Sequence, residues 1–181
     1  LILSSPPSNP KLLRTQAETG GRLVVSGENG WAFFDYNLAL FGPQEIPLGA
    51  YRLQMAMPPY GCDPSGYEVR IAGTIVAILR GGGCSFGIKV INAHKLGAKA
   101  VIIVNTEDTS NIRLKALPDE EPLIHIPCIM AGRRLQYYLE KKLKYYYLID
   151  QHIVSIQPSD RNGKYDDRHR LSLPTLKGKV E

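Results

Sequence analysis

Residues 71–105 show the clearest pattern of apolar and polar positions in the chain. Residues 74–79 (TIVAIL) form an apolar run with the length and β-branched content of a strand buried on both faces. A second apolar run follows at residues 100–104 (AVIIV). Between the two runs, apolar or small residues recur every three or four positions, at Phe86, Val90, Ala93 and Gly97. The pattern predicts a strand, a helix of roughly 12 residues and a parallel strand, joined by a right-handed crossover.

The predicted helix also indicates on which face the polar residues of this segment lie. Lys89, Asn92, His94 and Lys95 fall mostly off the apolar face, and Gly97 suits the C-terminal end of the helix. Residues 80–83 (RGGG) interrupt regular structure before the helix, because glycine weakens helix and strand alike and allows positive φ.

The rest of the chain predicts an α/β domain with several further strands. Residues 23–26 and 31–36 are expected to form a hairpin, since Asn29-Gly30 between them is a strong turn signal. Leucines four residues apart predict a second helix at 133–143. Further strands are expected at residues 48–57, 123–130 and 152–157.

Length and composition indicate one globular domain with two extensions. The 181 residues are 44% hydrophobic and 22% charged, which is ordinary for a folded domain. Residues 1–20 are an N-terminal extension, 21–157 the domain and 158–181 a charged C-terminal tail. Because the chain starts at Leu1, we expect an excised or mature piece of a longer precursor. No apolar run approaches the roughly 18–20 residues that cross a bilayer, so we expect no direct membrane insertion.

The formal net charge of +5 has a local source on the second helix. Basic and tyrosine residues interleave there: Arg133, Arg134, Tyr137, Tyr138, Lys141, Lys142, Lys144 and Tyr145 to Tyr147. This composition occurs in nucleic-acid-binding proteins. Inward leucines with basic side chains on the solvent face explain it better. We therefore expect no nucleic-acid partner, and we keep open an acidic partner for this helix.

The sequence offers four candidate chemical sites, and we expect none of them to be functional. Cys84 is in the turn, and His94, ten residues later, lies more than two turns into the predicted helix, so we expect no hydrogen bond between the thiol and the imidazole; no orienting group is evident. The glycine-rich turn lacks the endings of nucleotide-binding loops. The four histidines show no zinc-ligand spacing. The acidic residues 119–121 suit a solvated loop, with calcium as the alternative. We predict no catalytic residue, no metal and no cofactor.

The residues around the glycine-rich turn carry a family resemblance. Arg80-Gly-Gly-Gly-Cys84-Ser-Phe86, then Lys89-Val90, Asn92-Ala93, Gly97-Ala98 and AVIIVN up to residue 105, resemble the signature of the protease-associated (PA) domain. Segments 41–43 (FGP) and 58–64 (PPYGCDP) upstream, and 126–130 (IPCIM) with Gly132 and Leu135 downstream, extend the resemblance over about residues 20–157.

The resemblance implies a mixed sheet that forms an open barrel or a two-layer arrangement, flanked by helices near 86–97 and 132–144. It also implies a pair of cysteines at Cys62 and Cys84, which PA domains of the secretory route often bond to each other. Both cysteines are in predicted loops, and their disulfide would contribute about 3 kcal/mol in the chain-entropy model. Cys128 is expected to be a buried small residue. Three free thiols in a reducing compartment are the alternative.

The resemblance implies a non-catalytic module that binds a protein or peptide ligand. In plant sorting receptors the loop equivalent to residues 80–86 grips a peptide, so Arg80, Gly83, Ser85 and Phe86 become candidate contacts, with a core role as the alternative for Phe86. The polar segment 105–122 is a second candidate surface, because long loops in compact domains are often functional.

The compartment expected from a disulfide is the secretory-pathway lumen or the extracellular space. The alternative function is a regulatory or substrate-selecting domain of a larger enzyme. The RGGGCSF wording at residues 80–86 is most similar to luminal domains of transmembrane RING ubiquitin ligases, and it also resembles small secreted PA proteins. A protease parent is the other option.

Overall fold

The two apolar runs form neighbouring parallel strands, as the sequence predicts. In the computed structural model, which describes residues 20–27, 30–47, 49–145 and 152–159, β4 (Ile75–Leu79) pairs in parallel with β5 (Ala100–Val104). Helix α2 (Phe86–Lys95) connects them. Gly97, with φ of 89°, ends the helical segment in a conformation that side chains disfavour.

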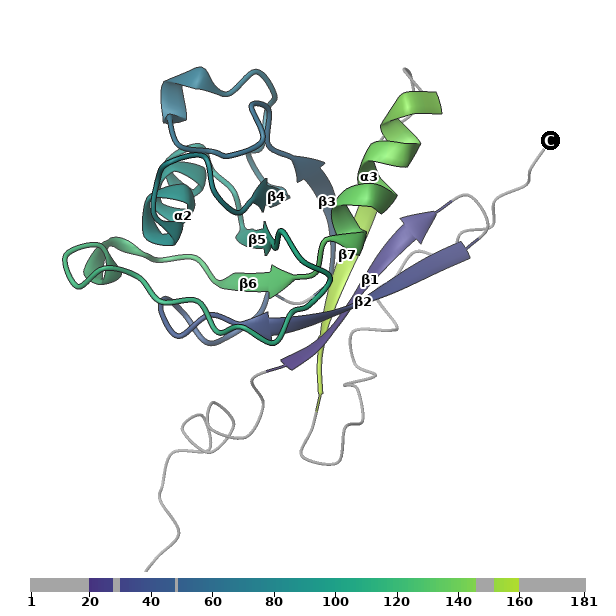
Figure 1. Cartoon of the computed structure of the whole chain (residues 1–181), viewed down its shortest axis with the longest axis horizontal. Helices are drawn as coiled ribbons and strands as arrows, with labels where there is room; N and C mark the ends of the chain where they lie inside the picture. Colours follow the sequence, from purple (N-terminus) through teal and green to yellow (C-terminus); the bar gives the residue numbers. More distant parts are fainter. Residues whose placement is uncertain (1–19, 28–29, 48, 146–151, 160–181) are drawn as a thin grey trace, which may run out of the picture.

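Within the described residues, seven strands close into a barrel in the order β1-β2-β6-β5-β4-β3-β7 (Figure 1). The other elements are β1 (Gly20–Gly27), β2 (Gly30–Leu38), β3 (Ala50–Met55), η1 (Pro64–Gly66), η2 (Glu121–Leu123), β6 (Cys128–Ala131), α3 (Arg134–Tyr145) and β7 (His152–Pro158). The predicted mixed α/β sheet with two helices is therefore confirmed.

The N-terminal hairpin and the last strand close the barrel. β1 and β2 are antiparallel, with Gly27 opposite Gly30, so the predicted hairpin is confirmed, although residues 28 and 29 lie outside the described ranges. β7 then pairs with both β1 and β3. Because of this double pairing, the sheet forms a closed barrel, whereas the resemblance implies an open barrel or a two-layer arrangement.

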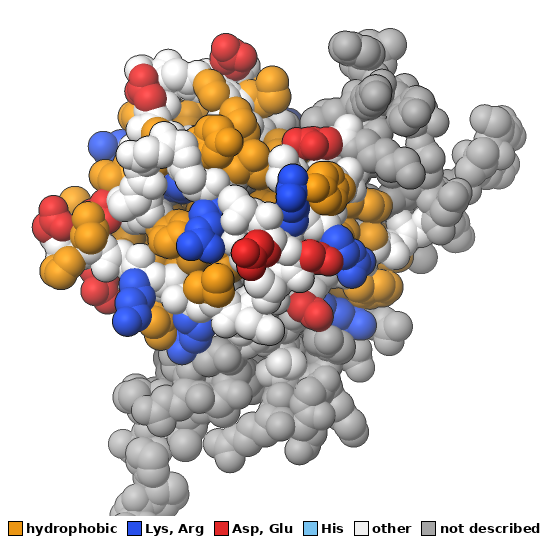
Figure 2. Space-filling view, in the orientation of Figure 1, with side chains coloured by type: hydrophobic (Ala, Val, Ile, Leu, Met, Phe, Trp, Pro, Cys, Tyr) orange, Lys and Arg blue, Asp and Glu red, His pale blue; other side chains and the backbone are white. Residues whose placement is uncertain are grey.

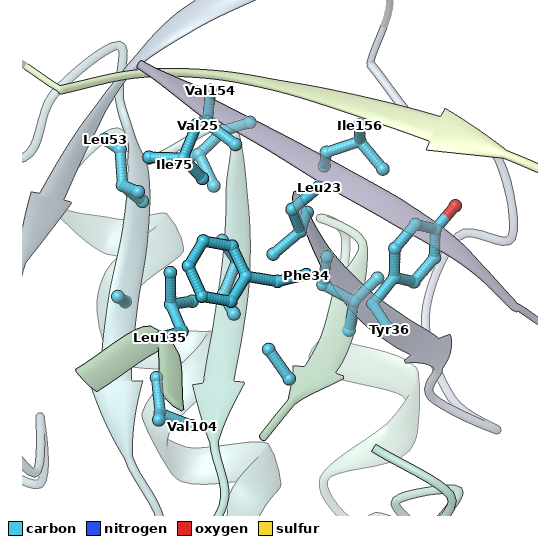
Figure 3. Close-up of a cluster of buried hydrophobic side chains, with 14 of the residues drawn as sticks. Leu23, Val25, Phe34, Tyr36, Leu53, Ile75, Val104, Leu135, Val154 and Ile156 are labelled. Carbon is cyan, nitrogen blue, oxygen red and sulfur yellow. The ribbon is translucent and has the colours of Figure 1, made fainter. Parts of the chain in front are cut away.

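Alternate residues of the parallel strands enter two different cores. Ile75 and Ala77 of β4 point into the barrel. They belong to the same buried cluster as Leu135 of α3 and Phe34 of β2 (Figure 3). Val76 and Ile78 of β4 pack on the outer face against Val90 and Ala93 of α2, among others. Because both faces are covered, these strands are apolar at nearly every position.

Two predicted strands are shorter in the structure than predicted. Residues 123–127 are not a strand: η2 covers Glu121–Leu123, and β6 is limited to Cys128–Ala131 because Pro122 and Pro127 interrupt extended pairing. The strand predicted at 48–57 is confined to Ala50–Met55.

Most of the two extensions lies outside the described residues. Of the predicted extension 1–20 and tail 158–181, the structure describes Gly20, Pro158 and Ser159, and Ser159 donates a backbone hydrogen bond to Gly20. The domain boundaries therefore stay predictions. Among the described residues, none of the helices has both the length and the apolar content to span a bilayer.

Candidate functional site

Three parallel strands, β4, β5 and β6, end side by side at one edge of the barrel, next to the middle of β2. The register places Leu79 beside Val104, Val104 beside Ala131, and Ala131 beside Tyr36. The residues next to these, Arg80, Asn105, Gly132 and Asp35, therefore lie in a row. We call Arg80 to Ser85, Asn105 to Asn111 and Gly132 to Arg134 the carboxyl edge, because they follow the carboxyl ends of three parallel strands. Ligands of α/β sheets commonly bind at such an edge.

The glycine-rich turn at this edge depends on its glycines. Gly81, Gly82 and Gly83 are exposed and have φ values of 103°, 78° and 88°. A Cβ on Gly82 would lie 2.4 Å from Cβ of Tyr60, whereas a Cβ on Gly83 would have no heavy atom within 4 Å. The turn therefore packs closely on Tyr60 at its centre and is open to solvent at Gly83.

The expected disulfide fixes the turn to the segment after β3. Cys62 and Cys84 are bonded, with their Cα atoms 5.7 Å apart, within the ordinary range for a disulfide. Cys84 therefore has no thiol for His94 to activate. Cys128 is free and fully buried, as expected, and burial raises the pKa of its thiol.

Two polar residues that the sequence places off the apolar face of α2 are buried, and that expectation is wrong. Lys89 is 0% exposed, and its Nζ donates hydrogen bonds of 2.6 Å to the carbonyls of Tyr60 and Gly81. Asn92 is 5% exposed and donates to the carbonyl of Gly61. These side chains brace the glycine-rich turn from below. Burial lowers the pKa of Lys89 to about 8.

Arg80 and Gly83 lie at the carboxyl edge in positions that a ligand can reach. The Arg80 Nη1 donates to Asn105 Oδ1 at 3.0 Å, and its guanidinium lies 5.8 Å from the centre of the Phe86 ring. Gly83 is exposed. Phe86 is partly buried and packs against the core beneath α2, in keeping with the core alternative.

Ser85 has a structural role, in which its hydroxyl group accepts one hydrogen bond and donates another. It is the N-cap of α2, where its Oγ accepts a hydrogen bond from the Ile88 N–H at 3.2 Å. The same hydroxyl donates to Glu120 Oε2 at 2.5 Å. The Ser85 hydroxyl has no second proton to donate, so it can donate to a ligand only by releasing Glu120.

The acidic cluster 119–121 is only partly a solvated loop. Glu120 is 6% exposed, and its carboxylate accepts from Ser85 and from the backbone N–H of Leu117. A Cβ on Gly87 would lie 2.8 Å from Glu120 Oε1, so this glycine lets the carboxylate approach the first turn of α2. In the part of the chain that the structure describes, no three His, Cys, Asp or Glu residues are grouped to hold a metal.

The segment after β5 is anchored to its neighbours. Asn105 Nδ2 donates to the Thr109 carbonyl, and Asn37 of β2 donates to the Ser110 carbonyl at 2.6 Å. The backbone N–H of Arg133 donates to the Glu107 carbonyl at 3.0 Å. Despite having no long helix or strand, residues 105–111 are therefore held by one internal bond and by bonds to β2 and to the start of α3.

A pocket of about 190 Å³ opens beside this segment. It is lined by Phe34 and Asp35 of β2, by residues 108–111, and by Gly132 and Arg134 at the start of α3. Sequence reasoning missed this pocket, because its walls come from three separate regions of the chain that only the strand register brings together.

The basic helix is described only over its first part. Arg133 and Arg134 are exposed and lie 4.9 Å and 5.6 Å from the ring centres of Tyr137 and Phe34. The side chains of residues 141–145 and all of 146 and 147 lie outside the described residues. On the face shown in Figure 2, Lys and Arg side chains lie among Asp and Glu side chains.

Comparisons with known proteins identify the family of this barrel. Residues 49–135 match the family model described as the PA domain. The structure resembles an aminopeptidase from Aneurinibacillus sp. strain AM-1, with a TM-score of 0.56 and 21% identity over 80% of this chain and 31% of that one. It also resembles a peptidase M28 precursor from Shewanella amazonensis SB2B, with a TM-score of 0.50 and 12% identity over 82% and 36% of the two chains.

At these identities, the structural likeness shows a shared fold alone. The chain spans about a third of the length of either protein. No curated protein matches the chain by sequence. The matched residues include the glycine-rich turn, both bonded cysteines and the parallel strands β3, β4, β5 and β6. The chain therefore contains a PA domain, as its sequence motifs indicate.

Proposed function

We propose that the chain is a non-catalytic interaction module that binds a protein or peptide at its carboxyl edge. The observation that supports this most is the braced and exposed glycine-rich turn. A disulfide holds it from one side, Lys89 holds it from below, and its backbone is nevertheless open at Gly83. Such bracing would reduce the ordering cost when a ligand binds.

The chemistry of the edge suits an extended peptide. Exposed glycines leave backbone N–H and C=O groups accessible to a ligand main chain. Arg80 adds a guanidinium for a carbonyl or carboxylate, and the partly exposed ring of Tyr60 adds apolar surface beside it. Together these groups would bind an extended peptide that places one hydrogen-bond acceptor at Arg80 and one apolar side chain at Tyr60.

The parent protein is best sought among peptidases, in which this domain would select or position substrates. The resemblance to an aminopeptidase and to a peptidase precursor favours that reading over a ubiquitin ligase. The open reading frame around residues 1–181 tests it: neighbouring peptidase motifs would support it, and a transmembrane run followed by a RING pattern would reject it.

An extracellular or secretory-lumen location fits the disulfide between two partly exposed cysteines, because such bonds persist in oxidising compartments. Blocking free thiols before cell lysis, followed by intact mass, tests this. Cys62 and Cys84 should be protected from alkylation in the native source, and alkylation of both would contradict the assignment.

The binding proposal is tested with peptides selected from a random display library on the immobilised chain. Arg80→Ala should weaken their binding at least about tenfold, the loss expected for one charge-assisted hydrogen bond. Arg70→Ala is the matched control, because Arg70 is an exposed arginine outside the carboxyl edge. Equal binding to both variants would reject the edge as the site. Ser85 is unsuitable for this test, since its loss would disturb the cap of α2.

A further inference from the structure

The pocket beside residues 105–111 holds three charged side chains that do not pair. Asp35, Asp108 and Arg134 all line it. In the ranges that the structure describes, none of the three forms an ion pair within 4.0 Å, and neither carboxylate accepts a hydrogen bond. Charged groups that share a small pocket but remain unpaired are available to a ligand.

The walls of this pocket are held in place without a ligand. Asn37 ties the segment 105–111 to β2, Arg133 ties it to the start of α3, and the Asn105 side chain bonds Thr109 within the segment. Gly132 contributes by its size, because a Cβ there would lie 2.9 Å from Asp108 Oδ1. The Asp108 carboxylate can therefore lie close to the backbone where α3 begins.

The size of the pocket limits what it accommodates. Its volume of about 190 Å³ lies below the roughly 300–1,000 Å³ typical of pockets for drug-sized ligands. It therefore suits one end of a chain or one polar group of a larger ligand.

The charges indicate the chemistry of that group. Two carboxylates and one guanidinium give the pocket a formal excess of negative charge, which favours a cation. Arg134 lies over the Phe34 ring on the same wall and presents donors for an oxygen close to that cation. A peptide amino terminus carries both features, since its ammonium group is two bonds from the first carbonyl carbon.

We infer that this pocket binds the free amino terminus of a peptide, with the ammonium group directed to Asp35 and Asp108 and the first carbonyl oxygen to Arg134. The inference rests on the proposed function, because the same peptide would continue along the carboxyl edge toward the glycine-rich turn. Arg80 lies along this path, and its partner Asn105 also bonds the segment that forms the pocket wall.

The test uses three probes and the full chain labelled with ¹⁵N. Trialanine amide, its N-acetylated form and acetyl-Ala-Lys-Ala amide are titrated while backbone amide shifts are followed. Trialanine amide should bind at least about tenfold more tightly than its acetylated form, with shifts at residues 108–111. Equal binding of the two forms would overturn the inference. Equal binding of the acetylated lysine peptide would overturn the assignment to an amino terminus.

Variants identify the groups responsible. The double variant Asp35→Asn with Asp108→Asn should lose the preference for the free amino terminus, while Asp119→Asn, which removes an exposed charge outside the pocket, should keep it. Arg134→Gln should weaken the binding of trialanine amide but not that of propylamine, which has no carbonyl. Retained preference in the double variant would overturn the inference. Chemical shifts away from the pocket confirm that each variant folds.

The outcome is separable from that of the proposed function. If Arg80→Ala abolishes binding of the selected peptides and the double aspartate variant does not, the interaction module stands and the amino-terminal pocket is rejected. If neither change affects them, both are rejected.

Discussion

Replacing Lys89 by methionine tests the bracing of the glycine-rich turn through its dependence on pH. Lys89 is completely buried beneath the turn, and its Nζ contacts two carbonyl oxygens at 2.6 Å and lies 4.0 Å from Cys62 Sγ. Methionine has a similar length and fills the space without a charge or a donor. The substitution therefore isolates the contribution of one ammonium group.

The magnitude follows from the pKa of this lysine. Burial lowers the pKa of Lys89 from 10.5 to about 8 in the folded chain. Between these pH values the unfolded chain holds a proton that the folded chain has released, so the free energy of unfolding rises with pH. The slope is about 1.4 kcal/mol per pH unit, and the whole window adds about 3 kcal/mol. Below pH 8 this contribution is absent.

The assay is urea unfolding of the wild-type chain, Lys89→Met and Lys95→Met at several pH values from 7 to 10.5. Lys95 is an exposed lysine on the same helix and serves as the control. Tyr67, whose pKa is raised to about 12 by burial, is present in all three chains, so its effect cancels in the differences.

We expect the free energy of unfolding of the wild type minus that of Lys89→Met to rise with pH across this window. The same difference for Lys95→Met should stay constant. A flat difference for Lys89→Met would refute the reasoning. It would mean that the Tyr60 and Gly81 carbonyls stabilise the ammonium group enough to offset its burial.

Three further predictions concern the same turn and the helix behind it. Reducing the disulfide, or replacing Cys62 and Cys84 by serine, should lower the free energy of unfolding by about 3 kcal/mol, measured in urea; an unchanged value would contradict its role in fixing the turn. Ser85→Ala should lower it by about 1 kcal/mol through loss of the N-cap, whereas Ser85→Thr should keep most of it. Gly82→Ala should destabilise the chain more than Gly83→Ala, because only the first adds an overlap to the strain of positive φ; equal thermal shifts would show that the turn is not packed as described.

The local elements with strong periodicity could be predicted from the sequence. β4, α2 and β5 follow from two apolar runs and one helical repeat, and the β1–β2 hairpin follows from the Asn-Gly turn signal. Local spacing dictates these elements, and tertiary contacts only extend or shorten them. β6 is shorter than predicted, because η2, with Pro122, takes the place of the start of the predicted strand and β6 begins only after Pro127.

Features that join distant segments could not be predicted. Barrel closure depends on β7 finding both β1 and β3, which no periodicity encodes. Spacing places Lys89 mostly off the apolar face of α2, yet it is buried, because the carbonyls of the turn accept from its ammonium group. The pocket needs Asp35, Asp108 and Arg134, which are far apart in sequence and meet only through the strand register.

The most direct test of peptide binding at the carboxyl edge is to map a selected peptide onto the ¹⁵N-labelled chain by amide chemical shifts. The account predicts that the largest changes fall on residues 80–83 and 105–111, with little change in the β1–β2 hairpin. Changes concentrated on the hairpin or on α3 beyond its first turn, with the glycine-rich turn unaffected, would contradict it.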